Sequence, residues 1–326
     1  MFRSPEWPLA VLARVAMRRR SLRRRRRPAA RPRLDLLEPW EQAVDEQTAR
    51  AHTLPGVHGF PFRPRGAEDV PDGALGALRR AVGAGDAEDL LVLPAHTRPG
   101  RLGDSRLQIL TPSSVLGFGP GGVALWVGAP ALPGVRVVLH PQQVAAIETA
   151  HVLLYARLTI FAPDARLNVH YNEVAGHELH PLVQSLRRRV ARTELDMPDA
   201  PAPNAGLPYK WRRLLTSDAA RLDDGDPVAA VAGALPVPRR SEAAYAAVVL
   251  TPRELVVLAD PVHADTTGGR HGLDTHAIPR ASIEQVRADG PLLRVRVCGA
   301  DLQLPLGQEL SARVVHEFAR HLPVAS

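Results

Sequence analysis

Near the C-terminus, hydrophobic and polar residues alternate in a pattern typical of a β-hairpin. Apolar Leu293, Val295 and Val297 alternate with arginines, and a Gly-Ala-Asp sequence supplies a turn before the alternation resumes. Successive side chains of a strand point to opposite faces. The segment 291–306 therefore predicts two antiparallel strands with one buried face.

Two further segments have the same design. In 153–171 apolar residues alternate with polar ones around a Pro-Asp sequence, and in 243–260 two apolar runs flank a Thr-Pro-Arg sequence. Pro and Asp favour tight turns. Both segments therefore predict strand pairs.

A longer period marks the last segment of the chain. Leu310, Val314 and Phe318 recur at every fourth position, which places them on one face of an α-helix. A second helix-like run lies earlier in the sequence. The predicted amphipathic helices are 173–190 and 308–322.

The chain contains one pattern twice. The sequence LTP occurs at 110–112 and at 250–252, an offset of 140, and the segment around Ile147 corresponds to the segment around Val286 at an offset of 139. Each copy continues with a predicted hairpin and a final helix. Self-similarity in a constant order indicates a structural repeat.

These elements predict an α+β fold that is mainly antiparallel β. Strands followed by one amphipathic helix favour a curved sheet or partial barrel whose open end the helix closes. A stretch rich in Pro, Ala and Asp separates the two copies and has the composition of a linker. The predicted parts are an Arg-rich arm (1–33), a partly helical lead-in (34–85), domain 1 (86–192), the linker (193–208) and domain 2 (209–326).

Three motifs of domain 2 carry a resemblance to a known family. They are an acidic opening, DGDPV at 224–228, a hairpin sequence, LTPR at 250–253, and a third element, IPRASIEQV at 278–286. In this order they resemble the bacterial pleckstrin-homology-like (PH-like) domains. The resemblance covers about 220–322 and, through the repeat, 86–190; Pro252 stands where the family usually has an acidic residue.

The resemblance implies two PH-like partial barrels in tandem. It also implies a binding or membrane-proximal role, and it carries over no catalytic residues, because the matched motifs form core and turns. We predict no cofactor.

Charge is distributed unevenly along the chain. The 326 residues include 41 Lys and Arg and 34 Asp and Glu, for a net charge of +7. Residues 1–33 hold 12 Arg and one acidic residue, a net +11, so the remainder of the chain carries a net −4. The basic character therefore belongs to the arm rather than to the domains.

The arm combines an apolar helical face with a basic run. Trp7, Leu9, Leu12 and Val15 precede the arginines Arg18, Arg19, Arg20, Arg23, Arg24, Arg25, Arg26 and Arg27. Apolar insertion plus attraction to anionic lipid would hold such a segment at a membrane surface. The same arginines could bind nucleic-acid phosphates, and a solvated arm is the third interpretation.

Two groups of residues could bind a metal ion. One is a loop with five nitrogen and oxygen ligands: His263, Asp265, His271, Asp274 and His276. The other contains His177 and His180, whose spacing of three differs from the spacing of four in zinc helices. A flexible solvated loop and surface histidines explain these residues as well, and we predict no bound metal.

A small basic and aromatic patch follows the linker. It consists of Tyr209, Lys210, Trp211, Arg212 and Arg213. Contact between the two domains, lipid headgroups and phosphate are its three possible roles, and domain contact is the simplest. A single cysteine, Cys298, excludes an intramolecular disulfide.

The sequence therefore predicts a non-enzymatic binding or scaffold protein. We expect it to be cytoplasmic, peripheral at the membrane through the arm, and to bind an unidentified protein or peptide by strand addition. The chain has no apolar run of membrane-spanning length. A metal-dependent enzyme that uses the His/Asp loop and a nucleic-acid binder that uses the arm remain the alternatives.

Overall fold

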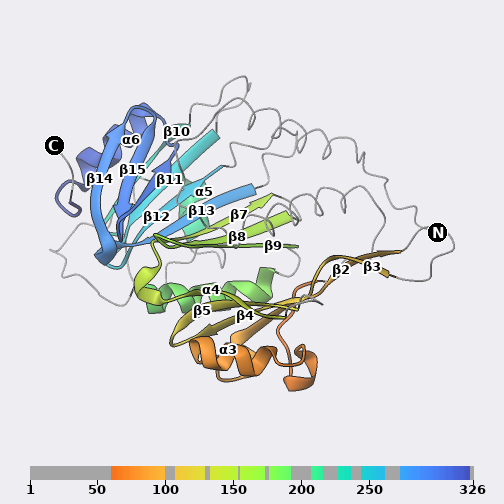
Figure 1. Ribbon diagram of the computed structural model, residues 1–326. Helices are drawn as coiled ribbons and strands as arrows, with labels where there is room; N and C mark the ends of the chain where they lie inside the picture. The colour runs from red at the N-terminus through yellow and green to blue at the C-terminus, as the bar shows by residue number, and fades with distance from the viewer. Residues whose placement is uncertain are drawn as a thin grey trace, which may run out of the picture.

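The structure is a computed structural model that describes residues 60–99, 107–128, 133–152, 155–172, 176–191, 207–215, 227–235, 244–260 and 272–323. Within these ranges the chain consists mostly of antiparallel strands, with four α-helices (Figure 1). The prediction of an α+β, mainly antiparallel β fold is confirmed. The predicted arm lies outside the described residues.

The described helices are α3 (Ala74–Val82), α4 (Gly176–Val190), α5 (Tyr209–Leu215) and α6 (Gln308–Phe318). The first strands are β1 (Leu90–Leu93), β2 (His96–Pro99), β3 (Leu107–Thr111), β4 (Ser114–Gly119), β5 (Gly122–Val127), β6 (Gly134–Leu139), β7 (Ala146–Val152), β8 (Tyr155–Phe161) and β9 (Arg166–Asn172). The later strands are β10 (Ala229–Leu235), β11 (Ala244–Leu250), β12 (Glu254–Ala259), β13 (Gly272–Pro279), β14 (Ile283–Asp289), β15 (Leu292–Val297) and β16 (Ala300–Leu304).

Two stretches of the chain have the same element order. In unit 1 (residues 60–191), β1, β4, β5 and β6 pair in one sheet, a 3-10 turn η3 (Pro141–Gln143) follows, and β7 to β9 and α4 complete the series. In unit 2 (residues 207–323), β10 to β13 are followed by η6 (Arg280–Ser282), β14 to β16 and α6. The hairpin β2–β3 is inserted between β1 and β4.

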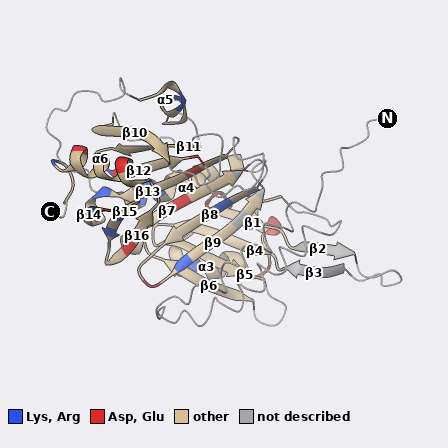
Figure 2. Cartoon of the chain, turned by 90° about the horizontal axis from the view of Figure 1, so that it is seen from above, with Lys and Arg blue, Asp and Glu red and all other residues tan. Residues whose placement is uncertain are grey.

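The two units share one sheet. β13 of unit 2 pairs antiparallel with β7 of unit 1, so that a seven-stranded sheet runs in the order β10-β11-β12-β13-β7-β8-β9. Seen from above, these strands lie side by side (Figure 2). We call the β13–β7 pairing the seam.

On the unit 2 side of the seam one face of the sheet lies on the core of unit 2, and on the unit 1 side the opposite face lies on the core of unit 1. Val248 and Val257 face the core of unit 2, and in register with them on the same face lie His276, Glu148 and Thr159. The opposite face belongs to the core of unit 1, where it carries Ile147, Leu158 and Ile160.

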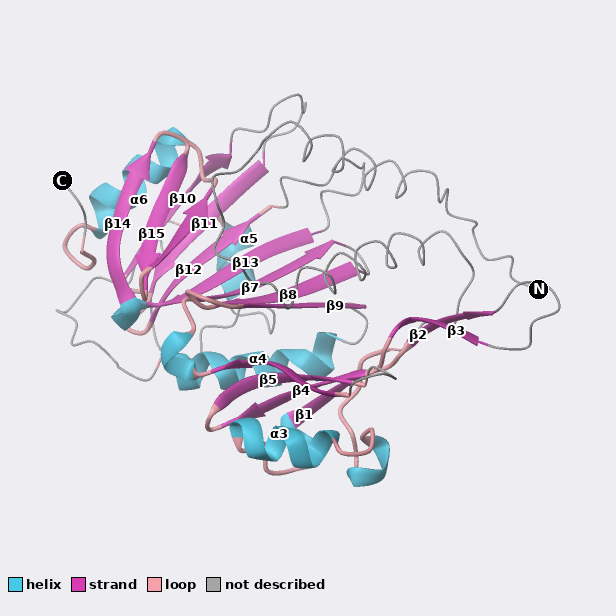
Figure 3. Ribbon diagram, viewed as in Figure 1, coloured by secondary structure: helices cyan, strands magenta, loops and turns pink. Residues whose placement is uncertain are grey.

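Helices cover the sheets on both sides. Figure 3 shows α4 between the sheet that contains β4 and β5 and the strands β7 to β9, and α3 on the far side of β4 and β5. In unit 2, α5 covers the outer face of β11 and β12 through Trp211, and α6 packs on the inner core through Val314 and Phe318. The predicted apolar stripe of the last helix is therefore its buried face.

Local details refine the sequence predictions. The hairpin β15–β16 turns at Cys298-Gly299, one residue before the predicted position, and both residues have positive φ, 49° and 77°. This conformation suits a two-residue hairpin turn. The LTP pair is not equivalent in space: Thr111 ends β3 in the inserted hairpin, whereas Thr251 lies in the turn between β11 and β12. The two units are therefore similar in element order rather than in that motif.

In the described residues, side-chain packing crosses the predicted boundary between the lead-in and domain 1 at residue 86. α3 lies within the predicted lead-in, yet Ala74, Leu78 and Val82 pack on the four-stranded sheet of unit 1. A backbone bridge between Phe62 and Val92 also joins the lead-in to β1. Unit 1 therefore begins at least as early as residue 60.

Candidate functional site

The loop predicted to bind metal is only partly described. Asp274 and His276 lie on β13, whereas His263, Asp265 and His271 are outside the described residues, as is the predicted anchor with Trp7 and the arginines of the arm. No group of three or more metal-binding side chains with suitable geometry occurs in the part of the chain that the structure describes.

Asp274 and His276 belong to a charged group at the seam. The strand register places Asp274 in line with Arg157 of β8, and His276 in line with Glu148 of β7, on one face of the sheet. Glu148 accepts a hydrogen bond from Arg157, and His276 Nδ1 lies 3.9 Å from Glu148 Oε2. We call these four residues the seam cluster. Sequence analysis found two of its members, because the other two come from the other unit.

Burial sets the protonation of the seam cluster. Burial, and then repulsion from Glu148, raise the pKa of Asp274 to about 6, while Arg157 partly opposes the rise. Burial lowers the pKa of His276, and Glu148 partly opposes this. At neutral pH the imidazole of His276 is therefore neutral.

A small cavity lies beside the seam cluster. Its volume is about 50 Å³, and its lining combines Asp274 and His276 with apolar Leu235, Val257, Ala259, Leu304, Pro305 and Leu306. A water molecule needs about 10–15 Å³ of such space, so the cavity can hold at least one. The lining therefore combines two titratable side chains with apolar side chains of unit 2.

The raised pKa of Asp274 predicts a pH-dependent stability. Between about pH 4 and 6 the folded protein retains a proton that the unfolded chain has lost, so the free energy of unfolding falls as pH rises. Asp274→Asn mimics the protonated side chain. We expect this variant to equal the wild type at pH 4 and to be about 2–3 kcal/mol more stable at pH 7.5. Urea unfolding at both pH values measures this, and an unchanged pH profile would contradict it.

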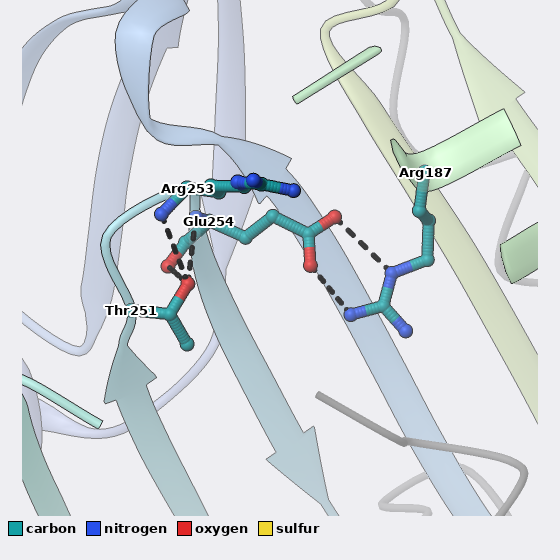
Figure 4. Close-up of polar contacts among 4 residues, drawn as sticks. All are labelled: Arg187, Thr251, Arg253 and Glu254. Carbon is teal, nitrogen blue, oxygen red and sulfur yellow. Dashed lines mark hydrogen bonds and ion pairs between the residues drawn. The ribbon is translucent and has the colours of Figure 1, made fainter. Parts of the chain in front are cut away.

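A second polar group is buried between the units. The guanidinium of Arg187, in the last turn of α4, donates two hydrogen bonds to the carboxylate of Glu254, which opens β12, at 3.1 and 2.6 Å (Figure 4). Both residues are buried, with 5% and 6% exposed. A bidentate pair of this kind fixes orientation as well as distance.

The turn before β12 holds Glu254 in place. The Thr251 hydroxyl accepts hydrogen bonds from the backbone N–H groups of Arg253 and Glu254, and it donates one to the carbonyl of Glu254. Figure 4 shows the side chain of Arg253 extending beside that of Glu254 toward Arg187. Sequence analysis missed this pair because its partners are 67 residues apart.

The basic and aromatic patch is divided between core and surface. Trp211 is buried against β11 and β12, whereas Tyr209 is 68% exposed. Lys210 forms an ion pair with Asp260 and lies over the Trp211 ring. Arg212 and Arg213 are exposed. In the described structure Trp211 thus anchors α5 on its own unit.

The two histidines of α4 differ in exposure. His177 is exposed and lies 3.4 Å from Glu178, and His180 is half-buried. Glu178 also lines a shallow groove of about 380 Å³ with Phe62, Arg63, Arg65 and Asp69. Two arginines and two acidic residues make this groove electrically balanced.

The comparisons with known proteins identify no relative. No protein-family model matches the chain, no curated protein shows a significant match, and no solved structure does so. Among the described helices, none combines the length and the apolar character that crossing a membrane would require.

Proposed function

We propose that the protein is a non-enzymatic scaffold built from two PH-like units and held at the cytoplasmic face of a membrane by its Arg-rich arm. The element order supports the PH-like assignment, because four strands, three strands and a helix follow one another in each unit. The motifs DGDPV and IPRASIEQV support the same assignment.

The observation that carries the scaffold proposal is the shared seven-stranded sheet. Six residue pairs of β13 and β7 join the units, and the buried Arg187–Glu254 pair adds a second connection. The units therefore present their surfaces in a fixed relative orientation. Buried Arg187 and Glu254 bind each other, and buried Glu148 binds Arg157, which is the arrangement expected of a structural platform.

The arm supplies the membrane part of the proposal. Its net charge of +11 contrasts with the net −4 of the remaining chain. Each basic residue near an anionic bilayer contributes about 1 kcal/mol of attraction. An unidentified protein or peptide partner would then bind to the platform at the membrane.

Replacing five arginines of the arm is expected to weaken binding to anionic vesicles strongly. In the full-length chain, Arg23, Arg24, Arg25, Arg26 and Arg27 are replaced by Gln, which removes five positive charges and leaves every described element intact. Co-sedimentation with vesicles of phosphatidylglycerol and phosphatidylcholine measures the change. We expect binding to weaken by at least 100-fold at about 1 kcal/mol per residue, and pure phosphatidylcholine to bind neither protein.

Unchanged binding of the arm variant would contradict the anchor. Steeply salt-dependent binding to DNA or RNA, with no affinity for vesicles, would instead favour the nucleic-acid interpretation of the arm.

A further inference from the structure

Arginines occur in four separate segments that contact one another: the last turn of α4, the β11–β12 turn, η6 and the end of α6. We call them the junction arginines: Arg187, Arg188, Arg189, Arg253, Arg280 and Arg320. They lie up to 133 residues apart in sequence. The described contacts bring their segments together.

Arg280 of η6 contacts two of the other segments, the β11–β12 turn and the end of α6. Its backbone N–H donates to the carbonyl of Arg253 at 2.8 Å, and its guanidinium donates to the carbonyls of Pro252 and His321 at 3.5 and 3.0 Å. Arg187 connects the same turn to α4 through Glu254. These hydrogen bonds therefore join the four segments.

The four segments carry a net positive charge, although the chain outside the arm is mildly acidic. The segments 187–191, 251–254, 279–282 and 317–323 contain six arginines and two acidic residues, Glu254 and Glu317, a net +4. Glu254 is buried and bound to Arg187. Burial, and then the positive charges of Arg280 and Arg320, lower the pKa of His321, which is the response expected in a positive potential.

The junction arginines differ in exposure. Arg187 and Arg280 are buried and hold the segments together, with 5% and 7% exposed. Arg188 and Arg320 are exposed at the surface. The buried arginines thus hold together the segments that carry the exposed ones. The planar guanidinium groups of the exposed arginines can donate paired hydrogen bonds to phosphate oxygens.

We propose that the junction arginines are a second membrane contact, which binds the phosphate headgroups of anionic lipids and orients the two-unit platform on the bilayer. This inference rests on the proposed function, because charge complementarity then gives the arm and the junction the same partner. The arm alone would tether the protein, whereas a contact on the folded units fixes which face meets the membrane.

The test replaces the two exposed junction arginines in the full-length chain. Arg188→Gln with Arg320→Gln removes two positive charges from the surface and spares the buried Arg187 and Arg280. We expect the affinity for phosphatidylglycerol vesicles, measured by co-sedimentation, to fall about tenfold or more. The variant Arg188→Lys with Arg320→Lys retains the charge, and we expect it to bind within about threefold of the wild type.

A matched control removes the same charge elsewhere. Arg80 on α3 and Arg212 on α5 are exposed, and their joint replacement by Gln gives the same net charge as the junction variant. We expect binding within about twofold of the wild type, because charges beyond about 10 Å from the lipid are screened. An equal loss in both Gln variants would show an effect of net charge alone and overturn the inference.

The arm variant separates the two proposals. If the arm variant loses vesicle binding while the junction variant binds as tightly as the wild type, the second contact is refuted and the arm anchor stands. If the wild type does not bind anionic vesicles, both proposals fail. A junction variant that loses affinity for DNA but none for vesicles would also overturn the lipid assignment.

Discussion

Replacing Arg187 by alanine is expected to lower the free energy of unfolding by about 3–5 kcal/mol, since it leaves the Glu254 carboxylate buried without its bidentate partner. The cost arises mostly from the uncompensated charge rather than from lost attraction. Glu254→Ala is expected to have an effect of similar size for the same reason. Chemical denaturation of both variants, followed by circular dichroism, measures the change.

Two controls test that explanation. The double variant Arg187→Met with Glu254→Leu removes both charges, and we expect it to recover most of the lost stability. Arg296 forms an exposed pair with Glu284, so Arg296→Ala is expected to cost less than about 1 kcal/mol. If Arg187→Ala were as mild as Arg296→Ala, the buried pair would not stabilise the junction.

Trp211→Ala is expected to lower the free energy of unfolding by about 3–5 kcal/mol. Trp211 is 2% exposed and fills the contact between α5 and the outer face of β11 and β12, next to Val249 and Val256. Its removal leaves a cavity in the contact that holds this short helix on the sheet. Thermal or urea unfolding measures the loss.

Tyr209 provides the matched control on the same helix. Because its ring is 68% exposed, we expect Tyr209→Ala to change the free energy of unfolding by less than about 0.5 kcal/mol. An effect of Trp211→Ala as small as this would mean that α5 does not depend on the tryptophan for its position.

The elements that depend on local pattern were predictable. The three predicted strand pairs match β8–β9, β11–β12 and β15–β16, because alternation at period two is a local property of one buried face. The final helix was predictable from Leu310, Val314 and Phe318 for the same reason. Matching short sequence motifs was less successful, as the two LTP sequences show. Three residues in a turn or at a strand end do not determine which element they belong to.

The relation between the units could not be read from the sequence. Hydrophobicity indicates that a strand has a buried face, but it does not indicate which strand pairs with which across 120 or more residues. The partners Arg187 and Glu254 and the four members of the seam cluster depend on that pairing. Asp274 and His276 therefore drew attention as loop ligands, whereas the structure places them in a sheet that joins the units.

The seam has a consequence for synthesis of the protein on the ribosome. β7 is complete once residue 152 has been made, but its partner β13 begins at Gly272. Until then the nascent unit 1 exposes a strand edge with unpaired backbone groups, which can pair with other chains. At about 5–20 residues per second the interval lasts roughly 6–24 s. Nascent-chain aggregation should therefore be greatest for chains arrested between these two strands.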